Sequence, residues 1–153
     1  MENENLIYLK ESVPQLVKTL DPDQQPSFGL MTAQHMIEHL IWVTKSSIKD
    51  MGAAPEELSD KQKGFMKFVK SGAQLEHRPS NKTKADLPQL RYSSLAEAVE
   101  ELPKAIDRLI QDYESRGDRH YYNPMMGILE PDEMLGFHVR HYQYHLEKQF
   151  GLG

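Results

Sequence analysis

The helical spacing of apolar residues, which repeats along nearly the whole chain, most constrains what this sequence can fold into. No segment alternates apolar and polar residues convincingly with a period of two, the pattern of a half-buried strand. Residues 4–20 show the helical spacing clearly, and we expect Pro14 to bend that helix. Its apolar stripe consists of Leu6, Leu9, Val13, Leu16, Val17 and Leu20. The pattern predicts an all-α protein.

Capping residues and helix breakers mark three further long helices. The predicted ranges are 31–51, 95–116 and 131–150. Thr32 and Ser94 can supply N-caps for the first two, and Pro131 suits the first turn of the third. Pro103 lies inside the second of these ranges, where we expect it to kink the helix.

The connection between the second and third long helices is itself long. It runs from about residue 51 to residue 93 and contains a short predicted helix that opens at Ser59 and closes at Gly72. Two short connections and one long crossover fit a four-helix bundle whose second and third helices run parallel. The 153 residues suit one domain that spans the whole chain, 1–153.

Five of the seven histidines lie on two of the predicted helices. His35 and His39 are four residues apart, and His138, His141 and His145 follow one another on the last helix. These spacings place side chains on one helix face, where each buried imidazole needs a polar partner. Helices in contact lie about 8–10 Å apart, so facing imidazoles can share one ion. The pattern favours a metal site with three protein ligands and an open position; the alternative is a set of hydrogen-bonded core or surface histidines.

Composition excludes several classes of protein. The chain has no cysteine, which excludes disulfides, thiolate zinc ligands and a cysteine nucleophile. A formal net charge of -5 argues against a nucleic-acid partner, since binding to a duplex needs a basic surface. No apolar run approaches the ~20 residues of a membrane span, so we expect no membrane partner. The acidic, polar N-terminus is unlike a signal peptide, and we expect a cytoplasmic location.

Two stretches of the chain carry a family resemblance: FGLMTAQHMIEHL in the second helix and NPMMGILEPDEMLGFHVRHYQYHLEKQFGL at the C-terminal end. They resemble the DinB-like (DinB/YfiT) superfamily of metal-binding four-helix bundles, in a bacterial branch, and the remainder of the chain resembles it only loosely. An HxxxH pair alone is common, whereas the NPxxG loop before it and the QFG after it are more specific. The chain departs from relatives at Asn123, where they often have His before the Pro, and at Met125 and Met126, where they often have aromatic residues.

The resemblance implies one metal ligand from the second helix and two from the HxxxH pair on the last helix. By motif, the first ligand falls on His39, within the QxxxxHL pattern that Gln34 and Leu40 complete. The pair falls on His141 and His145. The resemblance therefore implies a divalent metal held by three histidines.

Other residues near these positions have several interpretations. His35 and His138 are extra to the implied triad and could orient ligands, serve as additional ligands, or do neither. Glu38 could orient an imidazole or act as a base, although an exposed carboxylate is the ordinary interpretation. Trp42 could cover a pocket, whereas a lone Trp in a helix is more often part of the core. Tyr142 flanks the ligands and could hydrogen-bond a substrate or lie at the surface.

The resemblance also implies an activity, because characterised members of the superfamily include metal-dependent transferases and isomerases that use a low-molecular-weight thiol. We expect a divalent-metal enzyme, with zinc or nickel favoured, that acts on a small molecule as a thiol-dependent transferase or a hydrolase. The absence of cysteine fits a thiol supplied with the substrate. An oxepin-CoA hydrolase label carried by some relatives has little weight, because no CoA-binding element is visible. The alternative function is a non-catalytic metal- or ligand-binding bundle, and a homodimer is compatible with either.

Overall fold

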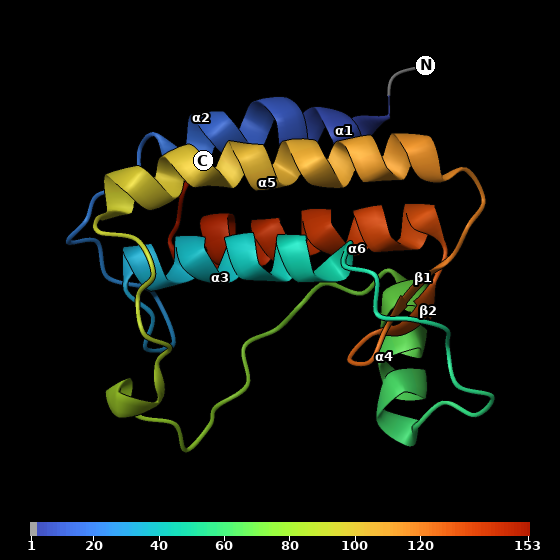
Figure 1. Cartoon of the computed structure of the whole chain (residues 1–153). Helices are drawn as coiled ribbons and strands as arrows, with labels where there is room; N and C mark the ends of the chain where they lie inside the picture. The colour runs from blue at the N-terminus through green and yellow to red at the C-terminus, as the bar shows by residue number, and fades with distance from the viewer. Residues whose placement is uncertain (1–2) are drawn as a thin grey trace.

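The computed structural model describes residues 3–153, and most of these residues are helical (Figure 1). Four helical rods account for the body of the molecule. The first rod comprises α1 (Glu4–Ile7), the π-helical turn η1 (Tyr8–Ser12) and α2 (Val13–Val17). The second is α3 (Ala33–Ser47), the third is α5 (Leu95–Arg116), and the fourth is α6 (Pro131–Gln143), continued by the π-helical turn η3 (Tyr144–Gln149).

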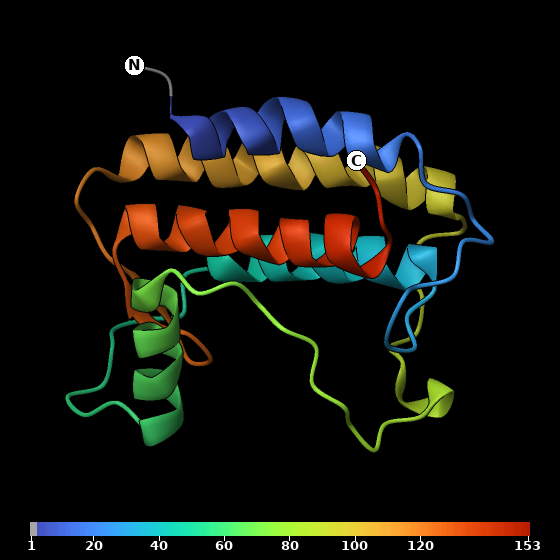
Figure 2. The ribbon, with the colours of Figure 1, turned by 180° about the vertical axis from the view of Figure 1, so that it is seen from behind.

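The four rods lie side by side in both views of the ribbon (Figures 1 and 2). The chain runs in one direction through α3 and α5 and in the opposite direction through the first rod and α6. The long connection between α3 and α5 makes this possible, because it returns the chain to the end of the molecule where α3 began. It contains α4 (Asp60–Ser71) and the short 3₁₀ helix η2 (Lys84–Asp86).

The first rod differs from the continuous bent helix expected over residues 4–20. Its helical part ends at Val17, and a π-helical turn interrupts it just before Pro14. In that turn the N–H of Val13 bonds to the carbonyl of Tyr8, five residues back. The proline ring would clash with the carbonyl four residues earlier in a regular α-helix, so a widened turn relieves the clash. By contrast, α5 continues through Pro103 as an α-helix.

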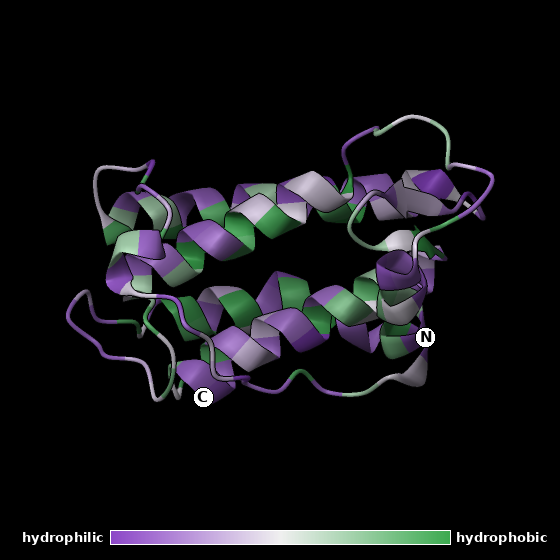
Figure 3. Ribbon diagram, turned by 90° about the horizontal axis from the view of Figure 1, so that it is seen from below, coloured by the Kyte–Doolittle hydropathy of each residue, from purple (hydrophilic) through white to green (hydrophobic). Residues whose placement is uncertain are grey.

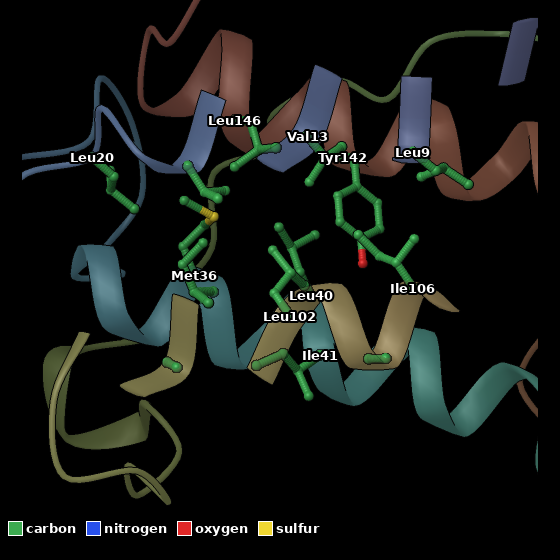
Figure 4. Packing of buried hydrophobic residues seen from close by; sticks show 14 of the residues in the cluster. Leu9, Val13, Leu20, Met36, Leu40, Ile41, Leu102, Ile106, Tyr142 and Leu146 are labelled. Atoms are coloured by element: carbon green, nitrogen blue, oxygen red, sulfur yellow. The ribbon is translucent and has the colours of Figure 1, made fainter. Parts of the chain in front are cut away.

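The main core lies between the four rods. Fully buried side chains from each rod meet there, and Figure 4 shows them pointing toward one another. They include Leu9, Leu40, Leu102, Tyr142 and Leu146. Hydrophobic and hydrophilic residues alternate around the long helices, as Figure 3 shows, which is the pattern of helices with one buried face. Among the described helices none is both long and apolar enough to cross a membrane.

A small hairpin between α5 and α6 was not expected from the sequence. Strands β1 (Tyr121–Asn123) and β2 (Gly127–Leu129) pair antiparallel, with Tyr122 opposite Ile128. Strands of three residues are too short to show a period of two. Gly127 has φ +78°, which favours glycine, and a Cβ there would lie 2.6 Å from the Met66 sulfur of α4, so the Met66 side chain would have to shift.

The short helix expected between Ser59 and Gly72 is present as α4. Ser59 and Gln62 form the capping box, and Gly72 ends the helix in the left-handed conformation at φ 72°. The Gln62 side chain also donates to the Pro124 carbonyl at 2.8 Å, which fixes α4 to the hairpin turn. A second apolar cluster joins α3, α4, the hairpin and α6: Val43, Val69, Tyr121, Met126, Leu129, Met134 and Phe137. This cluster packs α4 and the hairpin against α3 and α6.

Candidate metal centre

Three histidines from two rods converge at one point. His39 comes from α3, His141 from α6 and His145 from η3. The Nε2 atom of His141 lies 3.1 Å from Nε2 of His39 and 3.1 Å from Nε2 of His145. One ligand atom from each residue lies within 4.8 Å of the other two, so this group could hold a metal ion.

Gln149 fixes which nitrogen of His145 carries the proton. Nδ1 of His145 lies 2.7 Å from Oε1 of Gln149, and Nε2 of Gln149 donates to the Phe28 carbonyl at 3.2 Å. The amide nitrogen of Gln149 is therefore directed at Phe28, and its oxygen accepts the Nδ1 proton of His145. Nε2 of His145 then presents a lone pair to the centre, the form in which imidazole binds metals.

The backbone around Phe28 supports this arrangement. Ser27 N–H donates to the Gln149 carbonyl at 2.7 Å, and Gln24 donates to the Phe150 carbonyl at 2.6 Å. Gly29 has φ +79°, and a Cβ there would lie 3.1 Å from the Gln149 amide nitrogen. The loop between α2 and α3 thus holds Gln149, and through it the ring of His145.

His141 is positioned by packing. Its ring stacks on Phe137 with centroids 5.5 Å apart and planes inclined by 14°. Within residues 3–153 its Nδ1 is buried and has no hydrogen-bond partner. The exposed fraction of His141 is 6%, and that of His145 is also 6%, while His39 is half-buried. His39 is therefore the ligand that a molecule from solvent can approach.

All three imidazoles are held neutral. Burial lowers the pKa of His39 to about 4, with a further contribution from His145. Burial, followed by His145, His39 and His138, holds the pKa of His141 well below its usual range. Burial also lowers the pKa of His145, against the opposing effect of the hydrogen bond that its Nδ1 donates to Gln149. Neutral imidazole is the metal-binding form, so the centre is ready to bind a cation at neutral pH.

The donor set fits a tetrahedral divalent ion. Two nitrogens that each lie about 2.0–2.1 Å from one tetrahedral ion are roughly 3.3 Å apart, close to the two separations of 3.1 Å. A proton on His141 Nε2 could satisfy only one of its two neighbours, whereas a cation would satisfy all three lone pairs. Three histidines also leave a tetrahedral ion one position for water or substrate.

His35 and Glu38 lie beside the centre but hold a loop in place. His35 Nε2 lies 3.1 Å from the Pro88 carbonyl, and its Nδ1 lies 2.7 Å from Thr32 Oγ1. The Glu38 carboxylate accepts from the N–H groups of Arg91, at 2.7 Å, and Tyr92, at 3.3 Å. Both His35 nitrogens and both Glu38 oxygens are thus engaged away from the three-histidine group. Together they fasten segment 88–92 to α3.

His138 and Tyr142 lie in the interior, each bonded to α3. Nε2 of His138 lies 2.8 Å from Ser47 Oγ, and the Tyr142 hydroxyl lies 2.6 Å from Thr44 Oγ1. Ser47 and Thr44 donate their own protons to α3 carbonyls, so His138 and Tyr142 are the donors to them. His138 and Tyr142 are each 0% exposed. Neither reaches a surface where it could touch a substrate, and both anchor α6 to α3.

Trp42 is 47% exposed and lines a pocket of about 760 Å³ that α3, segment 88–92 and Arg108 of α5 form. His35, Glu38 and His39 line the same pocket, so the three-histidine group borders a cavity. Trp42 therefore lies at the pocket. Of the two interpretations of the sequence, a position at a pocket is correct and a position in the core is wrong.

Sequence reasoning did not assign a role to Gln149, Phe137 or the Phe28 carbonyl. Gln149 follows His145 by four residues, a spacing at which a helical side chain can orient an imidazole, so its signal was present. Phe137 precedes His141 by the same interval. The carbonyl of Phe28 carries no side-chain signal and emerges only from the fold.

No family model matches this chain, and it matches neither the curated proteins nor the solved structures with which it was compared. The resemblance to the DinB-like superfamily accordingly rests on the sequence motifs alone.

Proposed function

We propose that this protein is a divalent-metal-dependent enzyme of the DinB-like type, with the ion held by His39, His141 and His145. The observation that carries the proposal is the convergence of three neutral imidazole nitrogens, 3.1 Å apart in two of the pairs, beside a pocket. The arrangement of the rods supports the family: four helical rods with a long crossover between α3 and α5, and ligands on α3 and the last rod. A four-helix bundle is the class of fold that we propose for it.

The ligand set favours zinc or nickel. Imidazole suits both ions, the chain has no cysteine, and no carboxylate within residues 3–153 joins this group. A bound ion with an open position would act as a Lewis acid and lower the pKa of a water or a thiol placed there. We propose transfer to a low-molecular-weight thiol or hydrolysis of a small molecule as the reaction, since one open position serves either nucleophile.

Residues around the metal centre and the pocket have separate roles. Gln149 holds the proton on His145 Nδ1, so that Nε2 stays available as a ligand. Phe137 covers one face of His141 and excludes water from it. His39 borders the pocket, so a substrate in the pocket approaches the centre from the side of α3. Glu38 holds the loop that forms the opposite wall.

The test is cobalt substitution with visible spectroscopy. Cobalt(II) held by three histidines and one exchangeable ligand should give intense tetrahedral absorption bands that shift when 2-mercaptoethanol or azide is added. The bands should be absent in His141→Ala and present in the control His120→Ala, whose side chain is exposed beside the hairpin. Bands that do not respond to either added ligand would indicate a closed, non-catalytic site. An absence of bands in the parent protein would contradict the proposed metal site itself.

A further inference from the structure

The pocket beside the three-histidine group has a marked excess of positive charge. Its volume is about 760 Å³, within the range of small-molecule sites. Four cationic side chains line it: Lys45 of α3, Lys49 just beyond the end of α3, Arg91 of segment 88–92, and Arg108 of α5. Within residues 3–153 none of the four forms a salt bridge or donates a side-chain hydrogen bond.

Glu38 does not neutralise this charge. Among residues 3–153 it is the single carboxylate that lines the pocket, and its oxygens accept the N–H groups of Arg91 and Tyr92 and the amide of Gln34. These bonds bring the 88–92 segment, with the Arg91 side chain, to the pocket. The Glu38 carboxylate thus positions a cationic residue, Arg91, at the pocket.

Much of the remaining lining is apolar or aromatic. Trp42, Tyr92 and Ile41 contribute to it, and the half-exposed indole of Trp42 lies between His39 and Lys45 in the sequence of α3. Apolar lining with a few fixed charges is typical of sites that bind organic molecules. An aromatic surface beside ammonium and guanidinium groups suits a ligand that is apolar along its body and negative at one end.

We propose that the pocket binds an amphipathic organic anion, a carboxylate or a phosphate monoester, whose charged group lies among Lys45, Lys49, Arg91 and Arg108. Its apolar part lies along Trp42 and extends toward His39. The binding itself does not depend on the metal, whereas the statement that this anion is the substrate rests on the proposed function. Lys45 is six residues beyond His39, or roughly 9 Å along the α3 axis. A charged group held at Lys45 is displaced along α3 from His39, which leaves the other end of the ligand for the chemistry.

The only tryptophan of the chain gives a direct measurement, because Trp42 lines the pocket. Its fluorescence is titrated in chelator-treated protein with 4-phenylbutyrate, 4-phenylbutanamide, 4-phenylbutylamine and 4-phenylbutyl phosphate. These probes share one apolar body and differ in charge. We expect the two anions to bind at least about tenfold more tightly than the amide or the amine, and their binding to weaken as salt is added. The tighter of the two anions identifies the charged group.

Matched variants test the residues. Lys45→Gln and Arg108→Gln should each weaken anion binding roughly threefold to fivefold, as is typical of exposed ion pairs, and the double variant about tenfold or more. Lys63→Gln together with Lys67→Gln removes the same charge from α4, outside the pocket, and should leave the affinity unchanged. Circular dichroism checks that each variant is folded.

Two results would overturn the inference: equal affinity for the acid and the amide, or full anion affinity in the double variant Lys45→Gln/Arg108→Gln. Because the titration is done without metal, its outcome is separate from that of the cobalt experiment. Anion binding without a cobalt spectrum would support the anion site and contradict the proposed metal enzyme. A cobalt spectrum without a preference for anions would support the metal centre and contradict this class of substrate.

Discussion

His145 and Gln149 form the hydrogen bond that decides the chemistry of the centre: Nδ1 of the imidazole donates to Oε1 of the amide at 2.7 Å. The other end of the amide is fixed by the Phe28 carbonyl. A buried amide held at both ends orients the ring and keeps Nε2 directed at His39 and His141. Groups that orient metal ligands in this way have measurable effects on affinity.

Gln149→Leu should therefore weaken zinc binding by about 10- to 100-fold, because the ring of His145 loses its orientation and its tautomer is no longer fixed. Zinc affinity is measured by competition with a chromophoric chelator. Gln149→Glu retains an acceptor for Nδ1 but loses the donor to the Phe28 carbonyl, so it should keep only part of the affinity. Gln143→Leu, a half-buried glutamine of α6 outside this hydrogen bond, serves as the control. Parental affinity in Gln149→Leu would show that the amide does not orient the ligand.

The buried pair of Thr44 and Tyr142 should contribute to stability as a unit. Thr44→Val leaves the fully buried Tyr142 hydroxyl without a partner, so it should lower the free energy of unfolding by about 1–3 kcal/mol. Adding Tyr142→Phe removes the unpaired hydroxyl and should recover part of that loss. Urea unfolding of the two single variants and the double variant gives the coupling. Strictly additive effects would mean that the two groups do not interact.

The sequence predicted the features that depend on residues close together in the chain better than those that depend on distant contacts. The N-caps at Thr32, Ser59 and Ser94 were predicted because a cap depends on residues within one turn. The residues of the three-histidine group were predicted from helical spacing together with the family motif. Their closeness in space, with Nε2 of His39 3.1 Å from that of His141, comes from the packing of α3 against α6.

Other features depended on contacts that the sequence does not show. The hairpin is stabilised by α4, which packs Met66 over Gly127, and its strands are too short to have a pattern. His138 could not be distinguished from His141 by spacing, yet it turns to Ser47 and away from the shared centre. The cations of the pocket come from α3, α5 and the crossover loop, and only the fold brings them together.

The metal-free protein should lose stability as the pH falls below about 6.5. Burial lowers the pKa of His39 and of His138 to about 4, below the value of about 6.5 in an unfolded chain. The unfolded state therefore takes up protons first. The contribution of these neutral imidazoles to the free energy of unfolding is complete above about pH 6.5. It declines as the pH falls toward 4, by about 1.4 kcal/mol per pH unit for each proton that the unfolded state takes up.

Denaturant unfolding of chelator-treated protein across this pH range measures the decline. His138→Gln removes one titrating group and should make the decline shallower, whereas His120→Gln, at an exposed position, should leave it unchanged. A decline of equal slope in His138→Gln and the parent would contradict the role assigned to that buried imidazole.

Glu38→Ala should release the loop without weakening the metal centre. The N–H groups of Arg91 and Tyr92 lose their acceptor, so their hydrogen exchange should become at least about tenfold faster. Zinc affinity should stay within about twofold of the parent, and Glu38→Gln, which keeps an acceptor oxygen, should restore part of the protection. A large loss of zinc affinity with unchanged exchange at both amides would instead place Glu38 at the metal centre.

The most direct test of the three-histidine centre is the metal content of the protein purified without a histidine tag. Elemental analysis compares the parent with His145→Ala and with His120→Ala, which alters an exposed histidine outside the group. We expect about one zinc or nickel ion per chain in the parent and in His120→Ala, and almost none in His145→Ala. Equal metal content in all three proteins, or a parent that fails to bind added zinc, would contradict the assignment of His39, His141 and His145 as ligands.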